Sequence, residues 1–138
     1  ALFGRLDPGP ARRRRWIITG TLTMAALFLA MALLHSVWVD VGGAIALGLL
    51  SGYMVLQYAD VRTAYPAAMT GRAMAVFTMA MFLGVALVQW ATGLVASLAS
   101  AQGADPYVAV LLAITALLCA GALAFRLLPA PDNGKNSL

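Results

Sequence analysis

Four long apolar stretches without charged side chains dominate the chain. They are Trp16–Val39, Val41–Ala59, Ala73–Gly103 and Pro106–Phe125. Each reaches the length of ~18 residues that indicates a membrane-spanning helix. Hydrophobic residues make up 62% of the sequence and charged residues only 10%, which is too few charges to cover the surface of a soluble domain. The pattern predicts an all-α polytopic membrane protein with four transmembrane helices.

The ends of these stretches predict the helix boundaries. We expect spans at about 16–38, 41–60, 73–98 and 106–126, within a membrane domain over 16–128. Trp16 and Trp38 are expected in the aromatic belts, because a helix between them is roughly 33 Å long and a hydrocarbon core is about 30 Å thick. Residues 1–15 are expected to form a cytoplasmic loop with the end of a preceding helix, and 129–138 a cytoplasmic tail. The stretch "SVWVDVGG" is expected to be a tight turn between the first two spans.

All basic residues fall on one side of the predicted membrane. They precede the first window, lie between the second and third, or follow the fourth: Arg5, Arg12, Arg13, Arg14, Arg15, Arg62, Arg72, Arg126 and Lys135. The positive-inside rule makes that side cytoplasmic and places both termini of the segment there. The arginine run is therefore interpreted as an orientation anchor. A nucleic-acid partner is not expected, because no aromatic residues interleave with the basic ones. A signal peptide is disfavoured by the length of the first window and by the three spans after it.

The second and third spans carry polar side chains at helical spacing. Tyr53, Gln57 and Asp60 follow one another at i, i+4 and i+7 in the second span, and Thr78 and Gln89 lie in the third. Polar groups are costly in lipid unless they have partners. Two interpretations are about equally supported: these side chains line a watery substrate pathway, or they bond within the bundle while Asp60 pairs with an arginine.

Small residues at four-residue spacing mark other faces of the same two spans. Gly48 and Gly52 continue a ladder from Ala44, and Ala80 is followed by Gly84. Small-xxx-small spacing permits close approach of helix backbones, so these residues are expected to pack against neighbouring helices.

The residues of an enzyme or a metal site are not in place. Ser51 and His35 are the only tempting nucleophile and base, and they are expected at different depths of the membrane. Cys119 is the single cysteine, and no metal-ligand spacing exists. We expect no enzymatic activity, no metal and no cofactor.

The start of the chain resembles a loop signature of the major facilitator superfamily. In "ALFGRLDPGPARRRR", Gly4, Leu6, Asp7, Arg12 and Arg13 match a degenerate second copy of G-x-L-x-D-R-x-G-R-R. Asp7 comes one residue early, and "PGPA" replaces the usual R-x-G. The stretch "VRTAYPAAMTGRAMAVFTMAMFLGVALVQWATG" is similar to the family's passage from helix ten to helix eleven.

The resemblance implies that the chain is a C-terminal fragment, helices nine to twelve, of a twelve-helix secondary transporter. In the family, helices nine and twelve are peripheral, helix ten lines the pathway and helix eleven is closely associated with it. The substrate pathway would then include Tyr53, Gln57, Thr78 and Gln89. A cytoplasmic charge network that holds the outward-open state would include Asp7, Arg12, Arg13, Asp60, Arg62 and Arg72. Transport would proceed by alternating access around a midplane site.

The implied partners are the lipid bilayer, the remaining helices of the transporter and a small-molecule substrate. Where coupling is to protons, the titrating carboxylate is expected outside this chain, because every carboxylate here lies at a helix end or in a loop. Abundant alanine and arginine with a single lysine suit a GC-rich bacterial genome, which suggests a bacterial inner membrane. The alternative is a self-contained four-helix protein acting as a small exporter or assembly partner.

Overall fold

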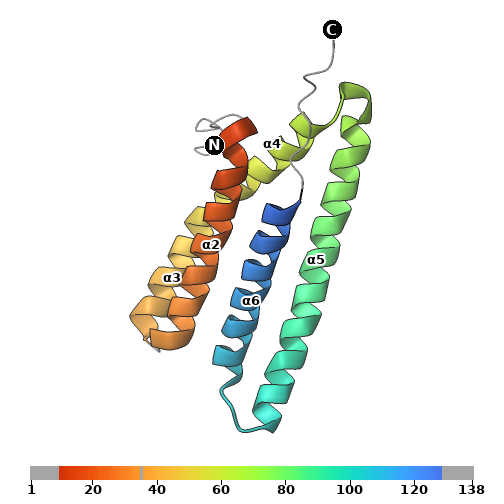
Figure 1. The fold of residues 1–138 in the computed structure, drawn as a ribbon. Coiled ribbons are helices and arrows are strands. Elements are labelled where there is room, and N and C mark those ends of the chain that lie inside the picture. The colour runs from red at the N-terminus through yellow and green to blue at the C-terminus, as the bar shows by residue number, and fades with distance from the viewer. Residues whose placement is uncertain (1–9, 35, 129–138) are drawn as a thin grey trace.

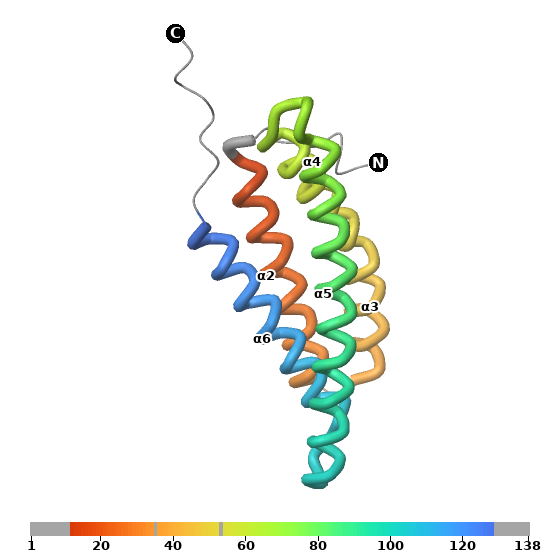
Figure 2. The backbone as a smooth tube through the Cα atoms, turned by 90° about the vertical axis from the view of Figure 1, so that its right-hand side faces the viewer, coloured from red at the N-terminus to blue at the C-terminus, as the bar shows by residue number. Residues whose placement is uncertain are grey.

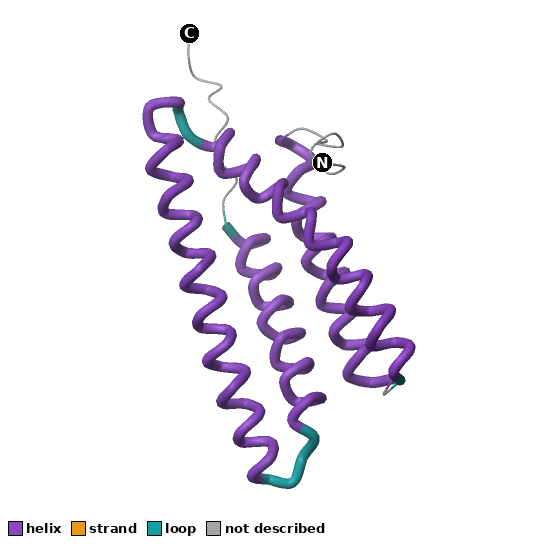
Figure 3. The backbone as a smooth tube through the Cα atoms, turned by 180° about the vertical axis from the view of Figure 1, so that it is seen from behind, coloured by secondary structure: helices purple, strands orange, loops and turns teal. Residues whose placement is uncertain are grey.

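The computed structural model describes residues 10–34 and 36–128, and for Pro10, Ala11 and Tyr53 the backbone alone. Its elements are α2 (Pro10–Leu34), α3 (Val37–Leu50), the 3₁₀ turn η1 (Ser51–Tyr53), α4 (Met54–Ala64), α5 (Ala67–Ala101) and α6 (Pro106–Leu127). Figure 3 shows that these ranges are helical apart from short connections. Four stretches are long and apolar enough to cross a membrane: Arg12–Leu34, Val37–Ala64, Ala67–Ala101 and Pro106–Leu127. The predicted all-α class with four spans is confirmed.

The helices form a bundle in which α2 and α6 are the central pair. In Figure 1, α6 lies between α2 and α5, and it packs against both. Helix α2 also contacts α3 and α4, and α4 reaches across to the start of α5. Figure 2 shows α2 and α6 running side by side along the bundle. We call the end at which α2 begins and α6 ends the arginine end, because Arg12–Arg15 and Arg126 lie there.

The arginine run lies inside α2, although residues 1–15 were predicted to form a cytoplasmic loop with the end of a preceding helix. Helix α2 begins at Pro10, where the fixed φ of proline suits the first turn. Arginine is a good helix former, so Arg12–Arg15 extend the helix outward beyond the apolar window. The charge pattern marks where the apolar stretch begins, at Trp16. The helix begins earlier, at Pro10.

The connection between the first two spans is shorter than predicted. Helix α2 ends at Leu34 and α3 begins at Val37, so Trp38 belongs to the second span and most of "SVWVDVGG" is helical. Asp40 lies in the first turn of α3, where the helix dipole favours a negative charge. However, Asp40 Oδ1 is shielded from solvent and accepts no hydrogen bond within the described residues.

The second span is interrupted in the middle by η1. The interruption contains Gly52, and glycine has a low helix propensity. The Ser51 hydroxyl donates to the Gly48 carbonyl oxygen at 2.6 Å. A 3₁₀ stretch in the middle of a helix often marks a hinge, and this one divides the span into α3 and α4.

The turn between α5 and α6 has a specific geometry. The N–H of Ala104 donates to Ala99 O and that of Gly103 to Ser100 O, at 2.9 and 3.1 Å, the two bonds of a Schellman motif. Gly103 has φ +72°, which only glycine adopts without strain. Asp105 then caps α6, because its carboxylate accepts from the Tyr107 N–H at 2.9 Å, with a proline in the first turn.

Two small apolar clusters hold the bundle together. Ile17 and Leu56 are buried near the arginine end, with Met24 and Phe125 packed against them. Met31, Ala32 and Leu111 are buried near the opposite end, surrounded by Phe28, Val39, Leu47 and Val108. Helix α5 joins neither cluster, and Ala99 is its one buried residue. The core of the described chain is therefore built on α2, and α5 keeps most of its apolar surface open.

Candidate functional site

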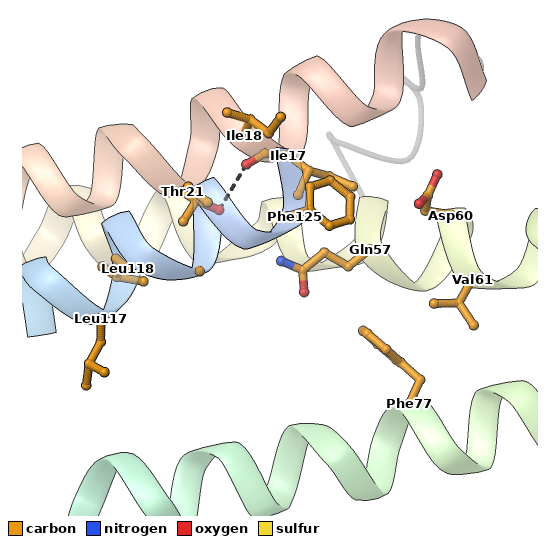
Figure 4. Close-up of a pocket in the computed structure, with 12 residues that line it drawn as sticks. Ile17, Ile18, Thr21, Gln57, Asp60, Val61, Phe77, Leu117, Leu118 and Phe125 are labelled. Carbon is orange, nitrogen blue, oxygen red and sulfur yellow. Dashed lines mark hydrogen bonds between the residues drawn. The ribbon is translucent and has the colours of Figure 1, made fainter. Parts of the chain in front are cut away.

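A cavity of about 370 Å³ opens between α2, α4, α5 and α6, near the arginine end. It is lined by Ile17, Ile18, Thr21, Gln57, Asp60, Val61, Phe77, Leu117, Leu118, Gly121, Ala122 and Phe125. Figure 4 shows how these side chains converge from all four helices. Its volume falls in the range of small-molecule sites, ~300–1,000 Å³.

The wall is apolar except for three side chains. Thr21 donates its hydroxyl proton to the Ile17 carbonyl oxygen of its own helix, at 3.0 Å. Gln57 and Asp60 come from one face of α4, because three residues make about one helical turn. Figure 4 shows the Gln57 amide directed into the space between α6 and α5. Its amide forms no hydrogen bond with a described residue, so it is the polar group most available to a ligand.

Aromatic packing holds the α5 wall of the cavity against α4. The rings of Tyr58 and Phe77 meet edge to face, with centroids 5.1 Å apart and an interplanar angle of 85°. The Tyr58 hydroxyl donates to Met81 Sδ at 3.6 Å. Edge-to-face pairs are a favoured aromatic geometry, and this one fixes the position of Phe77 on the cavity wall.

Arg13 closes the arginine end of the cavity region by binding α4. Only 4% of its surface is exposed. One guanidinium nitrogen donates to Ala59 O at 3.0 Å and to Thr63 Oγ1 at 2.8 Å. The same nitrogen lies 3.9 Å from Asp60 Oδ1, and the Asp60 side chain is 30% exposed. This nitrogen donates its hydrogen bonds to neutral oxygens. The Asp60 carboxylate compensates the guanidinium charge from a longer distance.

Arg14 binds the end of α6. Its Nη2 donates to the carbonyl oxygens of Phe125 at 2.5 Å, Arg126 at 3.4 Å and Leu128. The guanidinium also lies 5.1 Å from the centre of the Phe125 ring, within cation–π range. The last carbonyls of a helix lack intrahelical partners and carry partial negative charge, so Arg14 caps α6 from a neighbouring helix.

The sequence reasoning missed this cap and the part played by Thr63. A signal was present, because consecutive residues of a helix point ~100° apart. Neighbouring arginines in one helical turn therefore point toward different helices: Arg13 bonds to α4 and Arg14 bonds to α6.

The other predicted pathway residues do not meet at this cavity. Gln57 lines it, whereas Thr78 and Gln89 are outside its wall. Gln89 is exposed in the middle of α5 and Thr78 is half-buried. The Tyr53 side chain lies outside the described residues, so its role stays a prediction.

Among the described residues, the contact between Arg13 and Asp60 belongs to the predicted charge network. Arg13 and Asp60 come together, whereas Arg12, Arg62 and Arg72 are exposed and form no ion pair with a described residue. Asp7 lies outside the described residues.

The predicted packing glycines Gly48 and Gly84 have no close neighbour in the described part of the chain. A Cβ added to Gly48 or Gly84 would meet nothing within 4 Å, Ala80 is exposed and Gly52 half-buried. Gly43 instead makes the close approach, since a Cβ there would lie 2.7 Å from Met31 Sδ. The packing role of Gly48, Gly52, Ala80 and Gly84 stays a prediction.

Sites for other chemistry are not assembled in the described residues. The Ser51 hydroxyl donates to the carbonyl oxygen of Gly48, three residues earlier in the same span. His35 lies outside the described residues. No three metal-ligating side chains come together in ranges 10–34 and 36–128.

Comparison with known families supports the resemblance. The model of the Major Facilitator Superfamily matches residues 6–138. No curated protein and no solved structure matches the chain. Members of that family are transporters and not enzymes, and the four spans make this a multi-pass membrane protein. With the family model covering almost the whole sequence, the chain belongs to the major facilitator superfamily.

Proposed function

We propose that the four spans are helices nine to twelve of a secondary active transporter, which moves a small solute across a bacterial inner membrane by alternating access. In this proposal, α2 and α6 are the peripheral helices nine and twelve. The second span, α3–η1–α4, is helix ten, and α5 is helix eleven. Both ends of the segment lie in the cytoplasm, because the exposed arginines gather at one end of the bundle.

The observation that carries the proposal is the cavity beside Gln57. A polar amide without a partner among the described residues, in a helix long enough to cross a membrane, is costly unless it faces water, a ligand or another helix. Gln57 lines a space of about 370 Å³. The interrupted second span supplies the side chain, and transporters place binding sites beside interrupted helices.

The chemistry of the wall favours a neutral or amphipathic solute. Asp60 is the one charged residue on it, and Arg13 lies 3.9 Å from that carboxylate. The pair leaves little net charge for selecting an ion. Phe77 and Phe125 provide apolar surface, and Gln57 can both donate and accept hydrogen bonds.

The contact between Arg13 and Asp60 has a place in the same proposal. It joins the start of helix nine to the cytoplasmic end of helix ten. As part of a charge network with Asp7 and Arg12, it would stabilise the conformation that is closed toward the cytoplasm.

Accessibility of a cysteine at position 57 tests the proposal without knowledge of the substrate. In the full-length transporter with Cys119→Ser, Gln57→Cys is exposed to a membrane-impermeant maleimide from each side of oriented vesicles. Labelling from both sides, at rates that change in opposite directions when the conformational balance is shifted, is expected from alternating access. Leu22→Cys is the matched control, because Leu22 is 46% exposed and does not line the cavity. Equal protection of both cysteines would contradict a solvent-accessible pathway at Gln57.

A further inference from the structure

Two cavities share a pair of wall residues. The cavity beside Gln57 has a volume of about 370 Å³, and a second cavity of about 380 Å³ lies between α4 and the first turns of α5. Val61 and Phe77 line both cavities. We call the second cavity the α4–α5 groove. The other residues that line it are Tyr65, Met69, Arg72, Ala73 and Val76.

The α4–α5 groove lies closer to the arginine end than the cavity does. Helix α4 runs toward that end, and Gln57, Val61 and Tyr65 follow one another at four-residue spacing along one face. This face passes from the cavity at Gln57 into the groove at Tyr65. Tyr65, Met69 and Val76 are 49%, 52% and 66% exposed. The groove is therefore an open space that leads from the arginine end to the wall of the cavity.

Val61 and Phe77 form the part of this wall that lies between α4 and α5. Figure 4 shows their side chains extending toward each other from the two helices, beside the Gln57 amide. Both side chains are half-buried. Neither carries a polar group, so moving them apart breaks no hydrogen bond.

The barrier on the α2 side of the arginine end is polar instead. Arg13 is 4% exposed and donates to Ala59 O and Thr63 Oγ1. Its displacement would leave a buried charge and its acceptors without their bonds, which is costly. A rotation of the Phe77 side chain gives up the edge-to-face contact with the Tyr58 ring, which is a weaker interaction. The easier route between the cavity and the arginine end therefore passes Phe77.

We infer that Phe77, together with Val61, is the gate through which the solute passes between the cavity and the α4–α5 groove. The inference rests on the proposed function, because it makes the groove the cytoplasmic side of the same pathway. Tyr58 is then a positioning residue, since its ring holds Phe77 at the wall while Tyr58 itself lines neither cavity.

The rate at which position 57 is labelled from the cytoplasmic side tests the gate. The full-length transporter, with Cys119→Ser and Gln57→Cys as its only cysteine, is treated with a membrane-impermeant maleimide in inside-out vesicles. Phe77→Ala is expected to raise the labelling rate roughly threefold or more, because it removes the ring from the passage. The rate from the opposite side is expected to stay unchanged.

Phe82→Ala is the matched control for the loss of a phenylalanine from α5. Phe82 is 69% exposed and lines neither cavity, so this variant is expected to be labelled at the rate of the parent. Equal rates in the parent and in Phe77→Ala would overturn the gate. The same increase in Phe82→Ala would also overturn it, because the effect would then be a general loosening of α5.

Tyr58 supplies a second measurement, should Phe77→Ala not fold. Tyr58→Leu is expected to speed labelling from the cytoplasmic side, because Phe77 loses the ring that positions it. Tyr58→Phe keeps the ring and loses the 3.6 Å bond to Met81 Sδ, and it is expected to be labelled like the parent. Equal effects of the two substitutions would contradict positioning through the ring.

The outcomes for the gate are distinct from those for the proposed function. Labelling of the parent from both sides, with no response to Phe77→Ala, would overturn the gate and leave the proposed function in place. Protection of position 57 from both sides in the parent would contradict alternating access at the cavity. Phe77→Ala would then decide the gate alone: labelling that appears from the cytoplasmic side supports it, and continued protection overturns it.

Discussion

Arg14 and Phe125 are joined twice, through the backbone and through the ring. The Arg14 guanidinium donates to the Phe125 carbonyl oxygen at 2.5 Å and lies 5.1 Å from the centre of the same residue's ring. The bond satisfies a carbonyl at the last turn of α6, and the ring stacking holds the guanidinium in place. Since α2 and α6 form the most extensive helix pair of the bundle, this contact secures that pair at the arginine end.

Arg14→Gln is therefore expected to destabilise the helix bundle. The variant loses charge-assisted hydrogen bonds to the end of α6, each worth about 1.5–3 kcal/mol, and we expect a loss in that range. Unfolding of the purified full-length protein in SDS measures the change. Arg15→Gln is the control, measured without anionic lipid, because Arg15 is exposed and forms no ion pair with a described residue. Equal loss in both variants would contradict the capping role of Arg14.

The contact between Arg13 and Asp60 predicts unequal effects of its two partners. Arg13 is buried and its direct bonds go to Ala59 O and Thr63 Oγ1. Arg13→Ala therefore removes two charge-assisted hydrogen bonds, each worth about 1.5–3 kcal/mol, and we expect a loss of about 3 kcal/mol. Asp60 is partly exposed and 3.9 Å away, so Asp60→Asn is expected to cost at most about 1 kcal/mol.

The same SDS unfolding experiment on the two variants checks this asymmetry. Thr63→Val serves as a third measurement, because it removes the 2.8 Å bond and leaves the ion pair. A larger loss for Asp60→Asn than for Arg13→Ala would show that the ion pair, and not the bonds to neutral oxygens, holds α2 to α4.

Two glycines of α3 are expected to respond oppositely to alanine. A Cβ at Gly43 would lie 2.7 Å from Met31 Sδ, whereas one at Gly48 would meet nothing within 4 Å. Met31 is buried beside Leu111, so its displacement by Gly43→Ala is expected to cost about 1 kcal/mol. Gly48→Ala is expected to gain about 0.5–1 kcal/mol from higher helix propensity.

A double variant identifies the cause of the Gly43 effect. In Gly43→Ala/Met31→Ala, the clash is absent, so the two changes are expected to cost less together than the sum of the separate losses. Strict additivity would assign the effect to something other than the contact. A loss on Gly48→Ala in the full-length protein would instead reveal a neighbouring helix at that face, as small-residue spacing predicts.

Gln57 and Gln89 are both predicted to matter for transport, although Gln57 lines the cavity and Gln89 is exposed outside it. We expect Gln57→Leu to reduce uptake at least tenfold, since it removes the polar group directed into the cavity. Gln89→Leu is also expected to impair uptake while membrane insertion stays intact. Uptake into cells, with protein levels from membrane immunoblots, measures both. Unchanged kinetics in Gln89→Leu alone would assign that exposed residue to packing, and unchanged kinetics in Gln57→Leu would contradict the proposed site.

The sequence predicts what depends on local pattern and misses what depends on contacts between helices. The four spans follow from hydrophobicity alone, and the i, i+4, i+7 spacing identifies the face of α4 that carries Gln57 and Asp60. Gly48 has the spacing of a packing residue, yet Gly43 makes the close approach. Which glycine meets a neighbour depends on where α2 crosses α3, and no local pattern encodes that crossing. The cap by Arg14 likewise requires the end of α6 to lie beside the start of α2.

The helices extend beyond the predicted membrane spans for a related reason. Absence of charge marks where hydrocarbon can surround a helix, whereas helix propensity and caps decide where the helix begins and ends. Helix α5 therefore runs over Ala67–Ala101 although the predicted span was 73–98, and α2 takes in the whole arginine run.

The length of α5 has a consequence for which of its residues meet water. Its 35 residues extend about 52 Å, against a hydrocarbon thickness of about 30 Å. Even a tilt of 40°, at the upper limit for membrane helices, leaves about 13 Å, or roughly nine residues, outside the hydrocarbon. Arg72 makes the first turns the part that projects, since a guanidinium avoids hydrocarbon. The first turns of α5, which carry Arg72, are thus expected to project into the aqueous phase, where soluble proteases and antibodies can reach them.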